Sequence, residues 1–116
     1  MGPKRMEAKS KVWIEAGGEV VAGDGKMDLL KLIDETGSIQ KAAGQKGMSY
    51  RHAWGFLQKM EKRGGIKLVV TQIGGREGGG AKLTPQGKDF LRRYSAFREG
   101  LDGYIEEKFK RVFKAG

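Results

Sequence analysis

Residues 38–63 read SIQKAAGQKGMSYRHAWGFLQKMEKR, and this stretch contains the pattern that decides the fold. Ser38 and Ser49 are residue types that cap helices, so the sequence predicts a short helix after each of them, the second ending near Lys62. Gly47, between the two helices, can adopt the left-handed conformation that a tight turn requires. Two short helices joined by such a turn form the helix-turn-helix pattern.

The residues before this stretch predict a β-hairpin followed by a helix. Two β-prone runs, 11–16 and 19–22, flank a pair of glycines, as hairpin strands do. We expect Trp13 of this hairpin to lie in the core. A helix is expected over about 25–35 because its apolar residues recur at helical spacing, and Asp24 is expected to cap it.

The residues after it predict a second hairpin and a long helix. The β-prone runs 66–73 and 81–84 enclose the glycine-rich segment 74–80, which reads as the tip of a wing. Thr84 is expected to cap the last helix, with Pro85 at the first position, where proline is favoured. The expected fold class is therefore mainly α with small β-hairpins (α+β), a winged helix-turn-helix followed by a long C-terminal helix.

The C-terminal helix predicts a dimer. We divide the chain into a flexible N-terminus (1–10), a winged helix-turn-helix DNA-binding domain (11–84) and a dimerisation helix (85–116). A helix of about 28 residues would be on the order of 42 Å long, which exceeds the width of so small a domain. Its distal apolar stripe therefore needs a partner. The residues expected at a homodimer interface are Tyr94, Phe97, Leu101, Tyr104, Ile105, Phe109, Val112 and Phe113.

The charge of the chain indicates a polyanionic partner. The 116 residues carry a formal net charge of +9, from 23 Lys and Arg against 14 Asp and Glu. Residues 38–83 alone contain nine basic and two acidic side chains, a net charge of +7. The positive charge is thus concentrated on the helix-turn-helix and the wing, which favours double-stranded DNA as the partner.

Helix-turn-helix geometry indicates which residues contact the DNA. The second helix places its N-terminal side chains on base edges in the major groove. The glycines of the wing let its backbone lie close to the DNA, where Arg76 can reach a phosphate or the minor groove. The residues expected to bind DNA are Ser38, Gln40, Ser49, Tyr50, Arg51, His52, Gln58, Lys59, Arg76 and Lys82.

Three segments of the chain resemble one known family. They are LIDETGSIQKAA at 32–43, MSYRHAW at 48–54 and GGREGGGAKLTPQG at 74–87. Together they resemble the N-terminal DNA-binding domain of the ModE family of molybdate-responsive regulators, a winged helix related to the LysR-type DNA-binding module. The resemblance extends over about residues 11–113.

The resemblance implies a homodimer joined through helices outside the winged-helix core. It also implies operator binding through the recognition helix and the wing, with an inverted repeat as the DNA site of the dimer. Full-length members of the family carry C-terminal molybdate-binding domains, whereas this chain ends at Gly116. We therefore expect that this chain does not bind molybdate.

Other classes of function find little support in the sequence. Cysteine is absent and His52 is the only histidine, so neither a metal or other cofactor site nor a catalytic triad is indicated, and we expect no enzyme. The glycines at 23–25 lack the third glycine of a dinucleotide-binding loop. No apolar run approaches the roughly 18 residues of a membrane span, and no signal peptide follows Met1. A cytoplasmic, nucleoid-associated protein is expected.

The leading interpretation is a sequence-specific, dimeric transcriptional regulator that binds double-stranded DNA. Two alternatives remain open at this point. An architectural chromatin-type protein would use the same positive charge without reading bases. A protein-interaction module would use the wing and helix to bind another protein, with the charge incidental.

Overall fold

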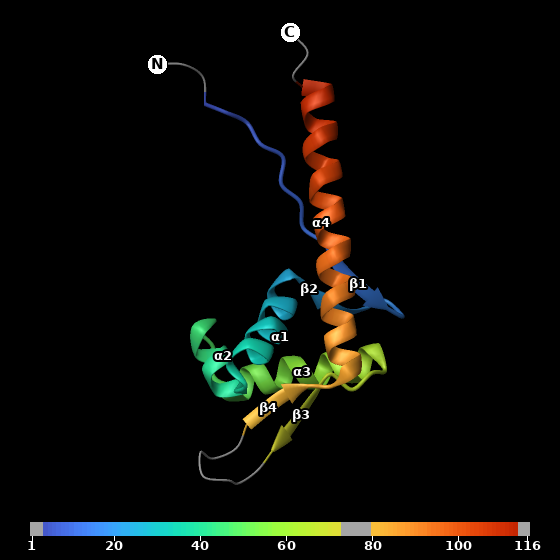
Figure 1. Cartoon of the computed structure of the whole chain (residues 1–116). Coiled ribbons are helices and arrows are strands. Elements are labelled where there is room, and N and C mark those ends of the chain that lie inside the picture. The colour runs from blue at the N-terminus through green and yellow to red at the C-terminus, as the bar shows by residue number, and fades with distance from the viewer. Residues whose placement is uncertain (1–3, 73–79, 114–116) are drawn as a thin grey trace.

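The computed structural model describes residues 4–72 and 80–113. These residues form four helices and two antiparallel hairpins (Figure 1), so the expected fold class, mainly α with small β-hairpins and a long last helix, is confirmed. In chain order the elements are β1 (Trp13–Ala16), β2 (Glu19–Gly23), α1 (Asp24–Thr36), α2 (Ile39–Gln45), α3 (Tyr50–Gly64), β3 (Val69–Gln72), β4 (Gly80–Leu83) and α4 (Pro85–Phe113).

The first hairpin packs on the helices through its second strand. Val21 and Ala22 of β2 are buried against the body, whereas most of β1 is exposed. The expectation that Trp13 lies in the core is therefore wrong. Trp13 belongs to the outer strand, its side chain is 55% exposed, and its indole Nε1 donates a hydrogen bond to Glu15 Oε2 (2.7 Å).

Helix α1 begins one residue earlier than expected and without the predicted cap. Gly23 is its N-cap residue and has no side chain to offer. Asp24 is itself helical, and its carboxylate accepts hydrogen bonds from Tyr94 and Arg98 of α4 instead of capping α1. The helix ends where Gly37, in the left-handed conformation (φ 69°), donates its backbone N–H to Ile33.

The helix-turn-helix forms as predicted. Ser38 and Ser49 each accept a hydrogen bond on Oγ from the backbone N–H three residues ahead, at 3.1 Å, so both serines cap their helices. Gly47 between the helices has a φ of 70°. The turn is closed by a hydrogen bond from Met48 N to Ala43 O (3.0 Å).

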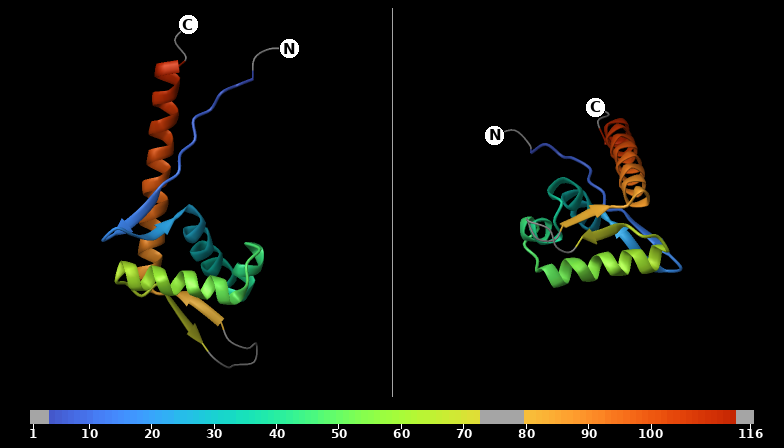
Figure 2. Two further views of the ribbon diagram at one scale, coloured as in Figure 1. Left: turned by 180° about the vertical axis from the view of Figure 1, so that it is seen from behind. Right: turned by 60° about the horizontal axis from the view of Figure 1, so that its bottom comes forward.

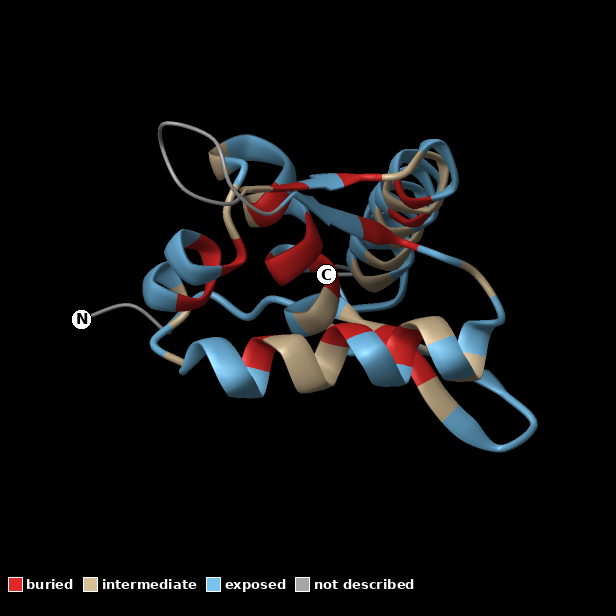
Figure 3. Ribbon diagram, turned by 90° about the horizontal axis from the view of Figure 1, so that it is seen from below, coloured by how far each residue is buried: buried red, intermediate tan, exposed pale blue. Residues whose placement is uncertain are grey.

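The hydrophobic core lies between α1, α2 and α3 and is completed by residues of β2, β3, β4 and α4. Figure 3 shows the buried row of α3 turned toward this core and the exposed positions turned away from it. Buried alanines in α2 and α3 let these two helices approach closely. The largest fully buried side chains are Leu29, Leu30, Ile33, Leu57, Met60 and Leu68.

A carboxylate joins the end of α3 to the second hairpin. Glu61 Oε2 accepts hydrogen bonds from the backbone N–H groups of Leu68 (2.8 Å) and Val69 (3.1 Å), where β3 begins. The antiparallel partner of β3, strand β4, is held in turn by a hydrogen bond from Ala81 N to Gly37 O (2.9 Å), at the end of α1. The hairpin is thus fixed to two helices.

Helix α4 begins at a close backbone contact. Thr84 caps it as predicted, because Thr84 Oγ1 accepts a hydrogen bond from Gly87 N (2.9 Å), and Pro85 is its first residue. A Cβ added at Gly87 would lie 2.3 Å from the carbonyl oxygen of Leu68. Only glycine therefore allows α4 to start this close to the segment that leads into β3.

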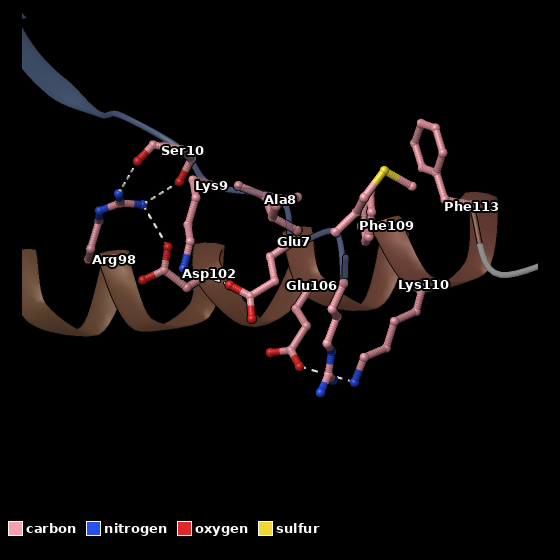
Figure 4. A pocket seen from close by; sticks show the side chains of 13 residues that line it. Glu7, Ala8, Lys9, Ser10, Arg98, Asp102, Glu106, Phe109, Lys110 and Phe113 are labelled. Carbon is pink, nitrogen blue, oxygen red and sulfur yellow. Dashed lines mark hydrogen bonds and ion pairs between the residues drawn. The ribbon is translucent and has the colours of Figure 1, made fainter. Parts of the chain in front are cut away.

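The second half of α4 extends beyond the body, and the N-terminal segment lies beside it (Figures 1 and 2). The molecule is elongated, with principal-axis extents of 63 × 37 × 21 Å. Residues 5–10 of the N-terminal segment and the distal part of α4 line a shared cavity of about 720 Å³ (Figure 4). Much of the distal helix surface remains exposed.

Polar contacts fix the first half of α4 to the start of α1. The hydroxyl of Tyr94 donates a hydrogen bond to Asp24, and the Arg98 guanidinium contacts both Asp24 carboxylate oxygens, at 3.1 and 3.2 Å. Arg98 also donates to the backbone oxygen of Ser10 (2.7 Å). Tyr94, which was predicted at the dimer interface, is only 6% exposed and belongs to the protomer's own core.

These contacts shift two pKa values. The hydrogen bond from Tyr94, and next the one from Arg98, lowers the pKa of Asp24 below its usual 3.8. Burial, and next the hydrogen bond to Asp24, raises the pKa of Tyr94 from 10.0 to about 12. The contribution of Asp24 to stability is therefore present above pH 3.8 and lost as the pH falls. That of Tyr94 is present below pH 10.0 and lost as the pH rises toward about 12.

Replacing Tyr94 with Phe should therefore destabilise the protein in a pH-dependent way. The deficit in the free energy of unfolding relative to wild type should be largest near neutral pH. It should shrink below about pH 4, where unfolding lets Asp24 take up a proton, and above about pH 10, where unfolding lets the tyrosine ionise. Urea titrations of both proteins from pH 3 to pH 11 would measure this difference. A deficit that stays constant over the whole range would contradict the assigned pKa shifts.

The start of α4 gives a second prediction. Gly87→Ala should lower the free energy of unfolding by about 1–3 kcal/mol, because the added methyl group overlaps a backbone carbonyl that cannot move without disturbing β3. Gly103→Ala is the matched control: a Cβ there meets nothing within 4 Å, so it should stabilise α4 by up to about 1 kcal/mol. Urea unfolding measures both. Equal effects of the two substitutions would show that the contact is not tight.

Candidate nucleic-acid interface

The side of α3 that faces away from the core carries the candidate interface. Ala53, Leu57 and Met60 point into the core. The opposite side, at helical spacing, is formed by the residues that we call the outer face of α3: Arg51, Gly55, Gln58, Lys59 and Lys62. The only carboxylate in α3 is Glu61, which is turned toward β3 and bonded there. The outer face is therefore cationic and contains no acidic side chain.

The cations of the outer face are free, whereas neighbouring cations are paired. Lys46 contacts Asp28, Arg63 contacts Glu19, and Lys67 contacts Glu61, at nitrogen–oxygen distances of 3.7, 3.0 and 3.3 Å. Within residues 4–72 and 80–113, no ion pair involves Arg51, Lys59, Lys62 or Lys82. The cations of this region without an ion-pair partner among the described residues thus include exposed side chains of α3 and the wing.

The start of α3 brings further predicted residues beside the outer face. Tyr50, the first residue of α3, is 50% exposed. Ser49, just before it, is exposed, although its hydroxyl is already used to cap the helix. In α2, Gln40 is exposed in the first turn, and Ser38, which caps that helix, is half-buried. These four residues lie at the N-terminal ends of the two helices.

His52 stands apart from the other predicted residues of α3. The imidazole ring of His52 packs against the ring of Phe56, with 4.6 Å between the ring centroids. The Nζ atom of Lys26, in α1, lies over the same Phe56 ring, 5.6 Å from its centroid. The histidine is exposed, but it belongs to the flank of α3 that faces α1. The structure therefore separates His52 from the outer face that contains Arg51 and Gln58.

Lys26 is a cation near this interface that sequence reasoning missed. Its pKa is lowered, first by burial and then by the positive charges of Arg63 and Lys59. In the sequence, Lys26 belongs to the predicted helix 25–35 and follows the incomplete dinucleotide-binding loop at 23–25, and neither feature indicates a position beside α3. No sequence pattern links α1 to the flank of α3, since their proximity follows from tertiary packing.

The second hairpin carries the wing residues. Lys82 of β4 is exposed and pairs in register with Val70 of β3, which is 37% exposed. Arg76 and the other residues at 74–79 of the predicted wing tip (74–80) lie outside the described residues, whereas Gly80 begins β4. The base of the wing is therefore defined, and it is held to α3 through Glu61.

The arrangement suits contact with duplex DNA. A helix of 15 residues is about 22 Å long, and the major groove of B-DNA, about 12 Å wide, admits an α-helix. Arginine can form two hydrogen bonds to guanine and glutamine two to adenine, whereas lysines contact phosphates with little regard to sequence. Arg51 and Gln58 on one face, with Lys59 and Lys62 beside them, supply both kinds of contact.

Over residues 4–72 and 80–113, no group of three or more His, Cys, Asp or Glu side chains is placed to hold a metal ion. None of the helices in the described part of the chain has the length and apolar character needed to cross a membrane.

Comparison with known families agrees with this geometry. The family model of the bacterial regulatory helix-turn-helix proteins, lysR family, matches residues 25–88, from α1 to the first turn of α4. The match includes the helix-turn-helix and the whole second hairpin.

Curated relatives confirm the resemblance to ModE. The molybdenum-pterin-binding protein MopB of Rhodobacter capsulatus is 39% identical over 79 residues, which are 68% of this chain and 29% of that protein. The molybdenum transport protein ModE of Azotobacter vinelandii is 38% identical, over 72% of this chain and 32% of its own length. The DNA-binding transcriptional dual regulator ModE of Escherichia coli K12 is 33% identical, over 77% and 34% respectively.

Solved structures share the fold. ArgP from Mycobacterium tuberculosis superposes with a TM-score of 0.53 at 23% identity, over 75% of this chain and 30% of that chain. The BenM DNA-binding domain, in a complex with catB site 1 DNA, gives a TM-score of 0.57 at 22% identity, over 79% of this chain and 96% of that chain.

The curated relatives are longer proteins, and this chain spans about a third of their length. What it shares with them is the unit that contains the helix-turn-helix and the wing. Because the family model matches more than half of its residues, the chain belongs to the lysR family of bacterial regulatory helix-turn-helix proteins.

Proposed function

We propose that this chain is a sequence-specific transcriptional regulator that binds double-stranded DNA as a homodimer, with α3 in the major groove. The observation that carries the proposal is the outer face of α3, where Arg51, Lys59 and Lys62 are exposed and unpaired among the described residues. The match to a regulatory helix-turn-helix family and the relatives named as transcriptional regulators support the same function.

The residues divide by the kind of contact they would make. Arg51 and Gln58 would read base edges, and Tyr50 would contact the DNA from the first turn of α3. The serine hydroxyls, the Gln40 amide and the lysines would contact phosphates, and Arg76 would do so from the wing. The phosphate contacts proposed are Ser38, Gln40, Ser49, Lys59, Lys62 and Lys82. His52, which faces α1, would serve at the edge of the contact.

The distal surface of α4 supports the homodimer. Phe97 is 51% exposed, Tyr104 is 61% exposed and Val112 is 58% exposed, and with half-buried Leu101 they form one side of the helix. Exposed apolar side chains gathered on one helix side mark an interface. We propose this side as the contact between the α4 helices of two protomers.

The remaining predicted interface residues have a different position. Ile105, Phe109 and Phe113 line the cavity between α4 and the N-terminal segment (Figure 4), so they would lie at the edge of the dimer contact. A two-fold pair of protomers would place two α3 helices on successive turns of one DNA face. The operator would then be an inverted repeat.

We propose further that the protein is cytoplasmic and associates with the nucleoid. The names of the relatives refer to molybdenum, but this chain matches only about a third of their length. The match to these relatives therefore gives no reason to assign molybdate binding to this chain. We propose DNA as the ligand of the described residues.

The DNA-binding proposal is tested with two variants, one of an arginine and one of a lysine. Their affinities are measured for an operator duplex that the wild-type protein selects from a random pool, and for a random duplex. Arg51→Ala should lose about 1–3 kcal/mol on the selected operator and much less on random DNA, because it removes a base contact. Lys62→Ala should weaken binding to both duplexes equally and flatten the salt dependence by about two units of log–log slope, about one for each protomer of the dimer. Fluorescence anisotropy at several salt concentrations measures these effects.

Three results would count against this assignment. Equal losses for Arg51→Ala on operator and random duplexes would remove Arg51 as a base reader. Failure of the selection to enrich any sequence would favour an architectural protein. The absence of measurable, salt-dependent DNA binding would favour a protein-interaction module.

The dimer is tested by placing a charge on its proposed surface. Tyr104→Glu should give monomers of about the 12.8 kDa chain mass, where wild type gives twice that value, because a buried carboxylate without a partner is strongly unfavourable. Light scattering measures the mass, and operator binding should weaken together with dimerisation. Ser95→Glu, an exposed position on the other side of α4, is the control and should remain dimeric. A wild-type monomer at micromolar concentration would contradict the proposal.

A further inference from the structure

Gly55 stands at the centre of the outer face of α3. Arg51 lies one turn before it, and Gln58 and Lys59 lie one turn after it, so the glycine is surrounded by long polar side chains on the helix surface. It is the sixth residue of a helix of 15 residues, too far from either end to serve as a cap. The position is therefore an interruption in an otherwise continuous row of side chains.

No feature of the described part of the protomer explains a glycine here. Its φ is not in the positive range that Gly47 and Gly65 adopt at the ends of α2 and α3. A Cβ added at Gly55 would meet nothing within 4 Å among the described residues, apart from neighbouring backbone of its own helix. Gly87, by contrast, is required by the Leu68 carbonyl, which a Cβ would approach to 2.3 Å.

Glycine inside a helix lowers stability relative to alanine, because it loses more backbone freedom on folding. At Gly55 this loss has no compensation within the described chain. A group outside the protomer that comes as close as a methyl group would occupy the empty space and supply the compensation. Close approach of backbone to a ligand is one of the recurrent reasons for glycine.

We infer that Gly55 is the point where α3 comes closest to the floor of the DNA major groove, so that the edge of a base pair occupies the space of the missing side chain. The inference rests on the proposed DNA-binding function. The neighbours of Gly55 favour a base edge as the group that fills this space. Arg51 and Gln58 are suited to bind bases, and a small residue between them lets both side chains reach the groove floor.

The distinguishing consequence is that one substitution raises stability and lowers DNA affinity. Gly55→Ala should raise the Tm of the free protein by about 3–6 °C, because alanine favours the helix and nothing in the described protomer obstructs it. It should weaken binding to the selected operator about tenfold or more, and Gly55→Leu should weaken it further. The salt dependence should stay that of wild type, since no cation is removed.

Gly103→Ala is the matched control, because it is also an open glycine within a helix but lies in distal α4. It should raise the Tm similarly and leave operator affinity unchanged. Thermal unfolding would give the Tm of wild type and of the three variants. Anisotropy titrations with the operator duplex at three salt concentrations would give their affinities and salt dependence.

The outcomes separate this inference from the function on which it rests. If wild type binds the operator and Gly55→Ala binds equally tightly, the inference is overturned and the proposed function stands. If Gly55→Ala lowers the Tm, the glycine has a reason within the protomer, and the inference is again overturned. If wild type binds no DNA at all, both fail. Raised Tm with weakened binding at unchanged salt dependence supports the inference.

Discussion

The candidate nucleic-acid interface depends most on the hydrogen bonds that the carboxylate of Glu61 accepts. It accepts the backbone N–H groups of Leu68 and Val69, and so it connects the end of α3 to the strand that begins the wing. Hydrogen bonds to a charged acceptor are stronger than neutral ones, and this one is partly shielded from water. The same contact removes the only acidic side chain of α3 from the outer face. One residue thereby sets both the geometry of the helix and wing and the sign of the charge that they present.

The direction of α4 follows from a second pair of constraints. Its first turn is held by the close approach of Gly87 to Leu68, and its third turn by the bonds of Tyr94 and Arg98 to Asp24. Two fixed points on one rigid helix determine where its distal half extends, beyond the body (Figure 2). The spacing of two recognition helices in a dimer would then be determined by how two such α4 helices cross, because α4 cannot pivot freely on the winged-helix body.

Much of this fold follows from local sequence signals, and the exceptions are tertiary. The serine caps, Gly47, and Thr84 with Pro85 act within a few residues of themselves, so the helix-turn-helix and the start of α4 were predictable. Asp24 resembles a cap in sequence, but in the folded protein its carboxylate is taken by α4, 70 residues later. Tyr94 matches the periodicity of the distal stripe, and only the packing of α4 on α1 buries it. The outer face was predicted in outline, whereas the inward turn of Glu61 and the approach of Lys26 to α3 needed the structure.

The distribution of charge explains why this surface favours a polyanion over a neutral partner. Around the outer face, Lys46 and Lys67 are paired with carboxylates, while Lys59 and Lys62 on one helix have no counterion among residues 4–72 and 80–113. At Lys26, burial first and then the positive charges of Arg63 and Lys59 lower the pKa. A surface of this kind is electrostatically unfavourable in the free protein, and a row of phosphates would relieve the repulsion that folding leaves in place. A neutral partner would bury the same cations without counterions, at a desolvation cost that nothing offsets.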